Sequence, residues 1–268
     1  MSIKVLCLTA LWERPRVAET CFKGLNRLRE EFDITVLAVH SGDEMDCKKY
    51  DIIPFEYKNQ PLGEKWNAGL REALKLKWDY LLTIGSDDLL SNELLRGYSW
   101  SAEAEGINRC GIVDLATGRK AIFENSYAIG CGRTIRRDVI ERMGDMVTVK
   151  YRESAAGPNV TRIPGKEITI SRHFWNRVKG ATDLVREEKK VPELWRNDIN
   201  HGLDFSSDTL LNANGVIQKI YLSDKILAVD LKSDVNIWPF ETYEKKDFDI
   251  DWLSEGEKDA IRRFRSAN

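Results

Sequence analysis

The feature that most constrains the fold is a helical pattern that runs into an apolar strand and then into two adjacent acids. It occupies residues 59–90, NQPLGEKWNAGLREALKLKWDYLLTIGSDDLL. Apolar side chains recur at helical spacing from Trp66 to Leu74, and Tyr80 to Ile84 form a short apolar run typical of a buried strand. Ligands of open α/β sheets bind at the carboxyl ends of the strands. We therefore expect Asp87 and Asp88 at a solvent-facing sheet edge, where paired carboxylates suit a divalent cation.

The preceding segments alternate between strand and helix. Apolar runs at 3–8 and 34–39 predict strands, and the apolar spacing after Pro15 predicts a helix between them. Such an alternation predicts a parallel, Rossmann-like sheet flanked by helices. Further along, the segment 111–123 predicts a hairpin around Thr117-Gly118, so the sheet is expected to become mixed.

The second half of the chain is predicted to elaborate the same domain. Residues 134–144, TIRRDVIERMG, predict a short helix, and 147–200 is interpreted as an insertion. A helix, a glycine and a strand follow at 210–220, and the Ser-x-x-Glu spacing at 254–257 predicts a capped helix. Because no repeat or low-complexity linker interrupts the chain, we expect one domain over 1–268.

Composition excludes several classes of protein. Lys plus Arg number 41 against 43 Asp plus Glu, a formal net charge of -2, so no global charge favours nucleic acid. No apolar run approaches the ~20 residues that span a bilayer. The cysteines are scattered and odd in number, which argues against a disulfide framework. The chain is therefore expected to be soluble and cytoplasmic.

Three segments resemble family 2 glycosyltransferases. WNAGLREALKLKWDYLLTIGSDD is similar to the segment in which Asn-x-Gly begins a helix that precedes Asp-Tyr, an apolar strand and a metal-binding acidic motif. The matching positions are Asn67, Gly69, Ala73, Asp79, Tyr80, Ser86, Asp87 and Asp88. GLDFSSDTLLNANGV resembles a segment with an acidic pair, a Leu-rich helix and a glycine, with Asp204 and Gly215 at that spacing. GCGRTIRRDVIERMG resembles a third segment, with a glycine, two basic residues and a helix.

The resemblance implies a GT-A fold and the transfer of a sugar, with inversion at the anomeric carbon, from a nucleotide-diphosphate sugar to an acceptor hydroxyl.

 The expected donor is a UDP-sugar, and the expected cofactor is Mn²⁺ or Mg²⁺. Asp87 would be the main metal ligand, with Asp88 sharing the metal. Asp204 would be the general base that takes the proton of the acceptor hydroxyl.

The same resemblance implies an internal division of the domain. Residues 1–90 would bind the nucleotide sugar, 91–225 would bind the acceptor, and 226–268 would form a C-terminal extension. The chain resembles small bacterial or phage-encoded relatives. A glycan or a modified DNA base is therefore the expected acceptor, and the host cytoplasm is the expected compartment for a phage protein.

The sequence departs from the family pattern at three places. Gly85 stands where the first acid of the Asp-x-Asp motif is usual. The second predicted strand ends in His40-Ser41-Gly42-Asp43 in place of Asp-Asp-Gly-Ser, and Leu203 replaces the acid before Asp204. These departures leave open how strongly the site binds a metal and which nucleotide it accepts.

Further donor contacts are expected beside the acids. The candidates at the ends of the first two predicted strands are Thr9, Ala10, Leu11, Arg14 and His40, and those nearer the acids are Lys65, Asn67 and Ser86. Arg14 is equally interpretable as a surface charge at the start of a helix, and for Lys65 the solvated surface charge is the favoured interpretation. His201 is a weaker candidate for a metal ligand. Trp175 and Trp195 are expected to anchor the insertion, or else to stack on an acceptor.

Two other functions stay open from the sequence. A nucleotidyltransferase also joins a Rossmann-like sheet to a metal-held nucleotide, but it normally has a Gly-rich basic loop after its first strand, and LTALWERPR has no glycine. A protein that binds nucleotide sugars without transferring them is the second alternative, because Gly85 and His40 replace usual acids.

Overall fold

The computed structural model describes residues 2–42, 47–143, 146–151, 167–171, 184–188, 193–200, 203–233 and 240–265. Only the backbone is described at 146–151, 167–171, 184–188 and 203–205, and at positions 241 and 265. Statements about the structure below concern these residues.

A seven-stranded mixed sheet forms the centre of the molecule, in the order β13-β6-β9-β4-β1-β2-β3. Its strands are β1 (Lys4–Ala10), β2 (Asp33–His40), β3 (Ile52–Glu56), β4 (Tyr80–Thr83), β6 (Ala104–Gly106), β9 (Thr134–Arg136) and β13 (Gln218–Ile220). β1 pairs in parallel with β2 and β4, and β3 with β2, whereas β9 is antiparallel to β4 and β6. The predicted fold class, a Rossmann-like mixed sheet flanked by helices, is confirmed.

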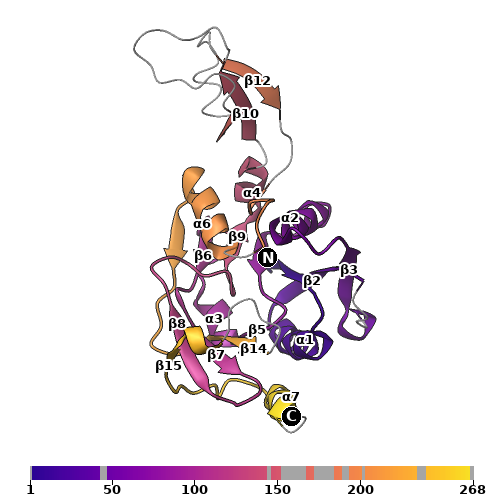
Figure 1. Ribbon diagram of the computed structural model, residues 1–268, viewed down its shortest axis with the longest axis vertical. Coiled ribbons are helices and arrows are strands. Elements are labelled where there is room, and N and C mark those ends of the chain that lie inside the picture. The colour runs from indigo at the N-terminus through magenta and orange to yellow at the C-terminus, as the bar shows by residue number, and fades with distance from the viewer. Residues whose placement is uncertain are drawn as a thin grey trace.

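Helices α1 (Pro15–Arg29) and α2 (Leu62–Ala73) pack on opposite faces of this sheet. Successive side chains of a strand point to opposite faces. Val5 and Cys7 accordingly lie in the core beneath α1, and Leu6 and Leu8 lie in the core beneath α2. This two-sided burial explains why the first strand is a continuous apolar run, and Figure 1 shows the strands between the two helices.

A five-stranded sheet, in the order β15-β8-β7-β14-β5, adjoins the first. It comprises β5 (Asp88–Leu90), β7 (Arg109–Asp114), β8 (Lys120–Glu124), β14 (Ala228–Lys232) and β15 (Glu244–Lys245). β7 and β8 are antiparallel, and Gly118 between them has a φ of 72°, a conformation that glycine adopts readily. The predicted hairpin is thus confirmed. Strands β5 and β14, which pair with each other, were not predicted from the sequence.

The predicted insertion contains a separate three-stranded antiparallel sheet. It consists of β10 (Met146–Tyr151), β11 (Glu167–Ser171) and β12 (Leu184–Glu188), with β10 in the middle. In Figure 1, β10 and β12 stand away from the two larger sheets, beyond α4 (Arg137–Met143). Of the two predicted anchors, Trp175 lies outside the described residues. Trp195 is buried and its ring centroid lies 5.1 Å from that of Trp66, so it packs as an anchor.

One predicted helix begins later than expected. Thr134–Arg136 form strand β9 because Ile135 pairs with Leu81 on one side and Ala104 on the other. The helix α4 then starts at Arg137. The apolar spacing of this segment fitted a helix throughout, but its first residues pair with two neighbouring strands.

The remaining helices are short. They are η1 (Cys47–Tyr50), α3 (Asn92–Gly97), α6 (Leu203–Ala213), η2 (Phe240–Thr242) and α7 (Glu255–Arg265). Before α7, the backbone N–H of Ser254 donates to Glu257 Oε2 at 2.7 Å, and the N–H of Glu257 donates to Ser254 Oγ at 3.3 Å. The predicted capping box is therefore confirmed.

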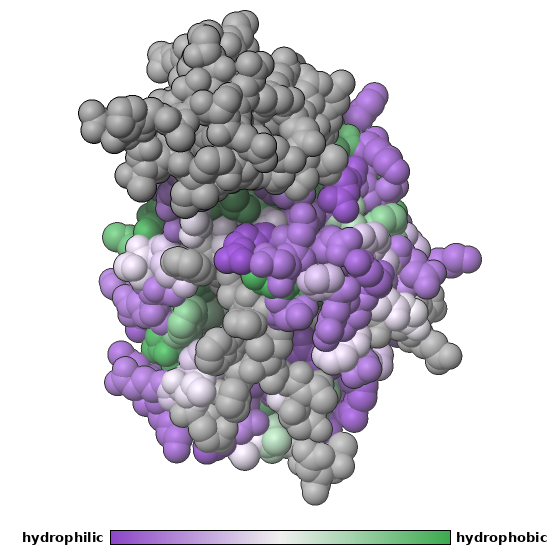
Figure 2. Space-filling view, turned by 45° about the horizontal axis from the view of Figure 1, so that its top comes forward, coloured by the Kyte–Doolittle hydropathy of each residue, from purple (hydrophilic) through white to green (hydrophobic). Residues whose placement is uncertain are grey.

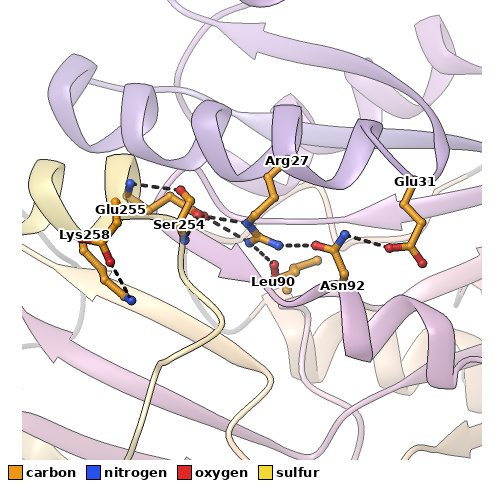
Figure 3. A network of polar contacts seen from close by, with 8 residues as sticks. Arg27, Glu31, Leu90, Asn92, Ser254, Glu255 and Lys258 are labelled. Carbon is orange, nitrogen blue, oxygen red and sulfur yellow. Dashed lines mark hydrogen bonds and ion pairs between the residues drawn. The ribbon is translucent and has the colours of Figure 1, made fainter.

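Helix α7 docks on α1 through a buried ion pair. Arg27 donates from Nε and Nη2 to the two carboxylate oxygens of Glu257, at 3.0 and 3.1 Å. The same guanidinium donates to the backbone carbonyl of Leu90 at 2.6 Å and to Asn92. Figure 3 shows this network, which joins the C-terminal helix to the start of α3.

The surface of the described residues is largely polar. Figure 2 shows hydrophilic side chains over most of the described part of one face, with apolar ones in small, separate patches. The exposed large apolar side chains are Ile3, Trp12, Ile53, Ile217 and Leu222. Within the described ranges, no helix combines the length and apolarity required to cross a membrane. All five cysteines are among the described residues, and each is buried and outside any disulfide.

Candidate functional site

Three carboxylates converge where the two large sheets meet. After β4 the chain turns at Gly85 and enters β5 at Asp88, which pairs with Asp230 of the antiparallel strand β14. The backbone N–H of Leu231 donates to the carbonyl of Asp87 at 2.8 Å. These pairings bring carboxylate oxygens of Asp87, Asp88 and Asp230 within 4.8 Å of one another. We refer to these three residues as the acid cluster.

The acid cluster is less exposed than the sequence suggested. We expected both adjacent acids in solvent beyond the end of a strand, but Asp88 is only 7% exposed and begins a strand of the second sheet. Its Oδ2 accepts a hydrogen bond from the N–H of Gly85 at 2.6 Å. The expectation of a solvated pair was wrong because β5 pairs with β14, a partner that lies far along the chain.

Burial and mutual repulsion raise the pKa values of two of these acids. The pKa of Asp88 is raised well above its ordinary value by burial and then by the charges of Asp230 and Asp87. The pKa of Asp230 is raised to about 6, chiefly by burial and then by Asp87. Oδ1 of Asp230 is buried and has no hydrogen-bond partner among the described residues. A cation that binds between close carboxylates of this kind stabilises their ionised forms, because it offsets their repulsion.

Two basic side chains flank the acid cluster. Arg14 Nη1 lies 2.8 Å from Asp87 Oδ2, and its Nη2 lies 3.5 Å from Ser86 Oγ. Lys232 Nζ lies 2.6 Å from Asp230 Oδ2. The structure thus brings together four predicted site residues, Arg14, Ser86, Asp87 and Asp88, and adds two, Asp230 and Lys232, that sequence reasoning missed. Their one sequence signal is a pair of charged residues within the apolar run Ala228–Lys232.

Gly85 makes room for the carboxylates. A Cβ atom at this position would lie 2.7 Å from Asp87 Oδ1 and 2.8 Å from Asp88 Oδ2, closer than real Cβ contacts. A side chain here would force the two carboxylates to shift. The acid that the Asp-x-Asp pattern would place at Gly85 is absent, and Asp230 supplies a third carboxylate from another strand.

The predicted donor contacts on β1 and β2 lie at the carboxyl ends of these strands. Thr9 and Leu11 are buried, whereas Ala10 and His40 are half-buried. The N–H of Leu11 donates to the carbonyl of Val39 at 2.8 Å, which holds the two strand ends side by side. Thr9 Oγ1 and His40 Nδ1 are buried polar atoms with no hydrogen-bond partner in the described part of the chain. Contact of either atom with a donor stays a prediction.

Lys65 and Asn67 are fully buried in α2. Lys65 Nζ donates to the carbonyl of Leu11 at 2.5 Å and to Asn59 Oδ1 at 3.2 Å. The Asn67 amide donates to the carbonyl of Trp195 at 2.6 Å and accepts from the N–H of Leu194 at 2.9 Å. These bonds hold the loop after β1 and the segment before α6 against α2. Direct contact of either side chain with a donor stays a prediction.

Asp204 is the second residue of α6, and its side chain lies outside the described residues, as does all of His201. The predicted helix and glycine are present, because α6 ends at Ala213 and Gly215 has a φ of 68°. The helix is attached to the body through Ser207, whose hydroxyl accepts from the buried guanidinium of Arg133.

Comparison with known proteins informs only the fold. No family model and no curated protein matches the sequence. S. aureus TarS 1-349 is 12% identical over 85% of this chain and 60% of its own, with a TM-score of 0.45. A mutant Drosophila β1,4-galactosyltransferase 7 in complex with manganese, UDP-Gal and xylobiose is 14% identical over 54% of this chain and 53% of its own, with a TM-score of 0.37.

A third solved structure is 4-diphosphocytidyl-2C-methyl-D-erythritol synthase from Anaerococcus prevotii. It is 15% identical over 80% of this chain and 97% of its own, with a TM-score of 0.38. This chain spans less than two thirds of the first two proteins. At such identities and TM-scores, none of the three likenesses bears on substrate or mechanism.

Proposed function

We propose that the chain is a divalent-metal-dependent, inverting glycosyltransferase of the GT-A type, which uses a nucleoside diphosphate sugar. The observation that carries this proposal is the convergence of Asp87, Asp88 and Asp230 at the carboxyl edge of a parallel sheet. Oxygen-only ligand sets suit Mg²⁺ and Mn²⁺, and this edge is where α/β proteins bind nucleotides.

The acid cluster would hold the cation, which supplies a Lewis acid that offsets the charge on the leaving diphosphate. The buried, unpaired oxygen of Asp230 supports this assignment. Arg14, which contacts Asp87, is placed to reach a phosphate, and Ser86 lies next to it. Thr9 and His40 are the proposed nucleoside contacts. A UDP-sugar is the proposed donor, and the acceptor is proposed to be a glycan or a modified DNA base.

Asp204 is the proposed general base. Its carboxylate would take the proton of the acceptor hydroxyl while that oxygen bonds to the anomeric carbon. The bond between the anomeric carbon and the diphosphate breaks at the same time, and its electron pair leaves with the nucleoside diphosphate. The position of Asp204 in the first turn of α6, with Gly215 after the helix, agrees with this assignment.

The metal and donor sites are tested by calorimetric titration of UDP in the presence of Mn²⁺ or of EDTA. We expect binding only with Mn²⁺, and its loss in Asp87→Asn. Asp247→Asn is the matched control, because Asp247 is 90% exposed and pairs with Lys120 away from the cluster. Failure of the wild type to bind UDP in the presence of Mn²⁺ would overturn the donor assignment.

The role of the general base is tested with the variant Asp204→Asn. Turnover of UDP-glucose, UDP-galactose and UDP-N-acetylglucosamine is measured with a panel of glycans and with DNA that contains a modified base as acceptors. We expect UDP affinity to be unchanged and transfer to fall by about 10²–10⁴-fold, the usual contribution of a general base. Equal transfer rates would remove Asp204 from the mechanism. Tight UDP binding by the wild type with no hydrolysis or transfer would favour a nucleotide-sugar-binding protein.

A further inference from the structure

Lys232 is a buried cation at the end of β14. It is 8% exposed, its Nζ lies 2.6 Å from Asp230 Oδ2, and the ring centroid of Tyr243 is 5.7 Å away. This ion pair holds the ammonium group of Lys232 beside the acid cluster.

The flanking cations do not fully neutralise the acid cluster. With all groups ionised, Asp87, Asp88 and Asp230 carry one more charge than Arg14 and Lys232 together. A divalent cation would reverse the sign and leave one net positive charge. A nucleoside diphosphate is then attracted to a site that has no net positive charge in the absence of metal.

Lys232 and a metal compete for the same group. A metal bound by Asp230 weakens the attraction of this carboxylate for Lys232, since the carboxylate charge is then shared. A lysine has a flexible four-carbon stem and three donors, so its ammonium group can turn to a new anion. Arg14 stands in the same relation to Asp87 on the other side of the cluster.

We propose that Lys232 is an exchangeable counter-ion, which pairs with Asp230 in the metal-free protein and turns to the donor diphosphate when a divalent cation binds. This inference rests on the proposed function and adds a phosphate-binding residue to it. Metal and diphosphate then bind with positive coupling, because each ligand strengthens the site for the other.

The experiment compares Lys232→Met with wild type in two titrations. Mn²⁺ binding is measured alone by electron paramagnetic resonance, and UDP binding is measured by calorimetry at saturating Mn²⁺. We expect Lys232→Met to bind Mn²⁺ about tenfold more tightly, because a competing cation is gone, and UDP about tenfold more weakly. Lys232→Arg should retain UDP binding. Lys225→Met, which removes an exposed lysine paired with Glu93, is the matched control and should change neither affinity.

Tighter Mn²⁺ binding together with weaker UDP binding would distinguish counter-ion exchange from a purely structural ion pair. Unchanged affinities in Lys232→Met, or weaker binding of both ligands, would overturn the inference. The proposed function would still stand as long as the wild type binds Mn²⁺ and UDP. If the wild type binds neither Mn²⁺ nor UDP, both fail together. Thermal unfolding monitors the fold of each variant. If Lys232→Met does not fold, Arg14→Met is measured in the same two titrations. It should bind Mn²⁺ more tightly and UDP more weakly, because Arg14 pairs with Asp87 as Lys232 pairs with Asp230.

Discussion

Two regions of this protein bury carboxylates in opposite ways. In the network of Figure 3, Glu257 is fully buried, and both of its oxygens accept hydrogen bonds from Arg27. In the acid cluster, Asp88 and Asp230 lie opposite each other, and Oδ1 of Asp230 has no partner among the described residues. The first region balances its charges internally, and the second concentrates charge of one sign.

The pKa values follow the same division. Beside the Arg27 network, Arg96 and then Asn92 lower the pKa of the exposed Glu31 to about 2. In the acid cluster, burial and repulsion raise the pKa of Asp230 to about 6. A carboxylate that is buried against one cation stabilises the fold, whereas carboxylates gathered in one place raise one another's pKa values and suit a divalent cation.

The largest expected effect is on stability in the Arg27 network. Glu257→Ala leaves the Arg27 guanidinium without its anion, so the free energy of unfolding should fall by about 3–5 kcal/mol in urea denaturation. Mn²⁺ binding by the folded variant should be unchanged. Glu255→Ala, in the same first turn but with a 74% exposed side chain, is the control and should change stability little. A fall confined to Mn²⁺ affinity would contradict the comparison.

The second prediction reverses this pattern in the acid cluster. Asp230→Asn removes one ligand and one repelling charge, so Mn²⁺ affinity should fall at least about tenfold, equal to about 1.4 kcal/mol. The free energy of unfolding in EDTA should fall by less than in Glu257→Ala, because the change removes a repelling charge as well as the partner of Lys232. Calorimetry and urea denaturation measure the two quantities, and a large loss of stability with normal Mn²⁺ affinity would assign Asp230 a structural role.

The third prediction uses a glycine from each region. Gly85→Ala places a Cβ against two carboxylates and should lower the free energy of unfolding by about 1–3 kcal/mol. Gly256→Ala lies in α7 with no atom closer than Ser254 Oγ at 4.0 Å, so it should raise that free energy by about 0.5–1 kcal/mol. Urea denaturation of both variants tests the contrast. Equal effects would show that the turn at Gly85 relaxes around a side chain.

The smallest expected effect depends on pH. The Glu31 pKa is lower in the folded protein than its ordinary value of 4.5, so its pair with Arg96 stabilises the fold fully above that pH. The contribution is lost as pH falls toward about 2. The stability difference between wild type and Glu31→Gln should therefore shrink between pH 6 and pH 3.5, measured by urea denaturation. A difference that grows on acidification would contradict the assigned sign.

Much of the first ninety residues was predictable because their burial is local and regular. The apolar runs of β1 and β2 and the helical spacing of α2 follow from the faces they bury, and the Ser254 box follows from capping chemistry. Strand β3 was missed, since Ile52–Glu56 carries a proline and an acid at an edge of the sheet. The helix predicted from Thr134 lost its first turn to β9.

The sequence by itself determined the pattern of strands and helices and placed Asp87 after β4, since both depend on neighbours within a few residues. Only the tertiary structure decided that Asp88 is buried and that Asp230 and Lys232 join it. Their meeting depends on the register between β5 and β14, which more than a hundred residues separate. Hydrogen bonds between strands fix that register, and local periodicity does not encode it.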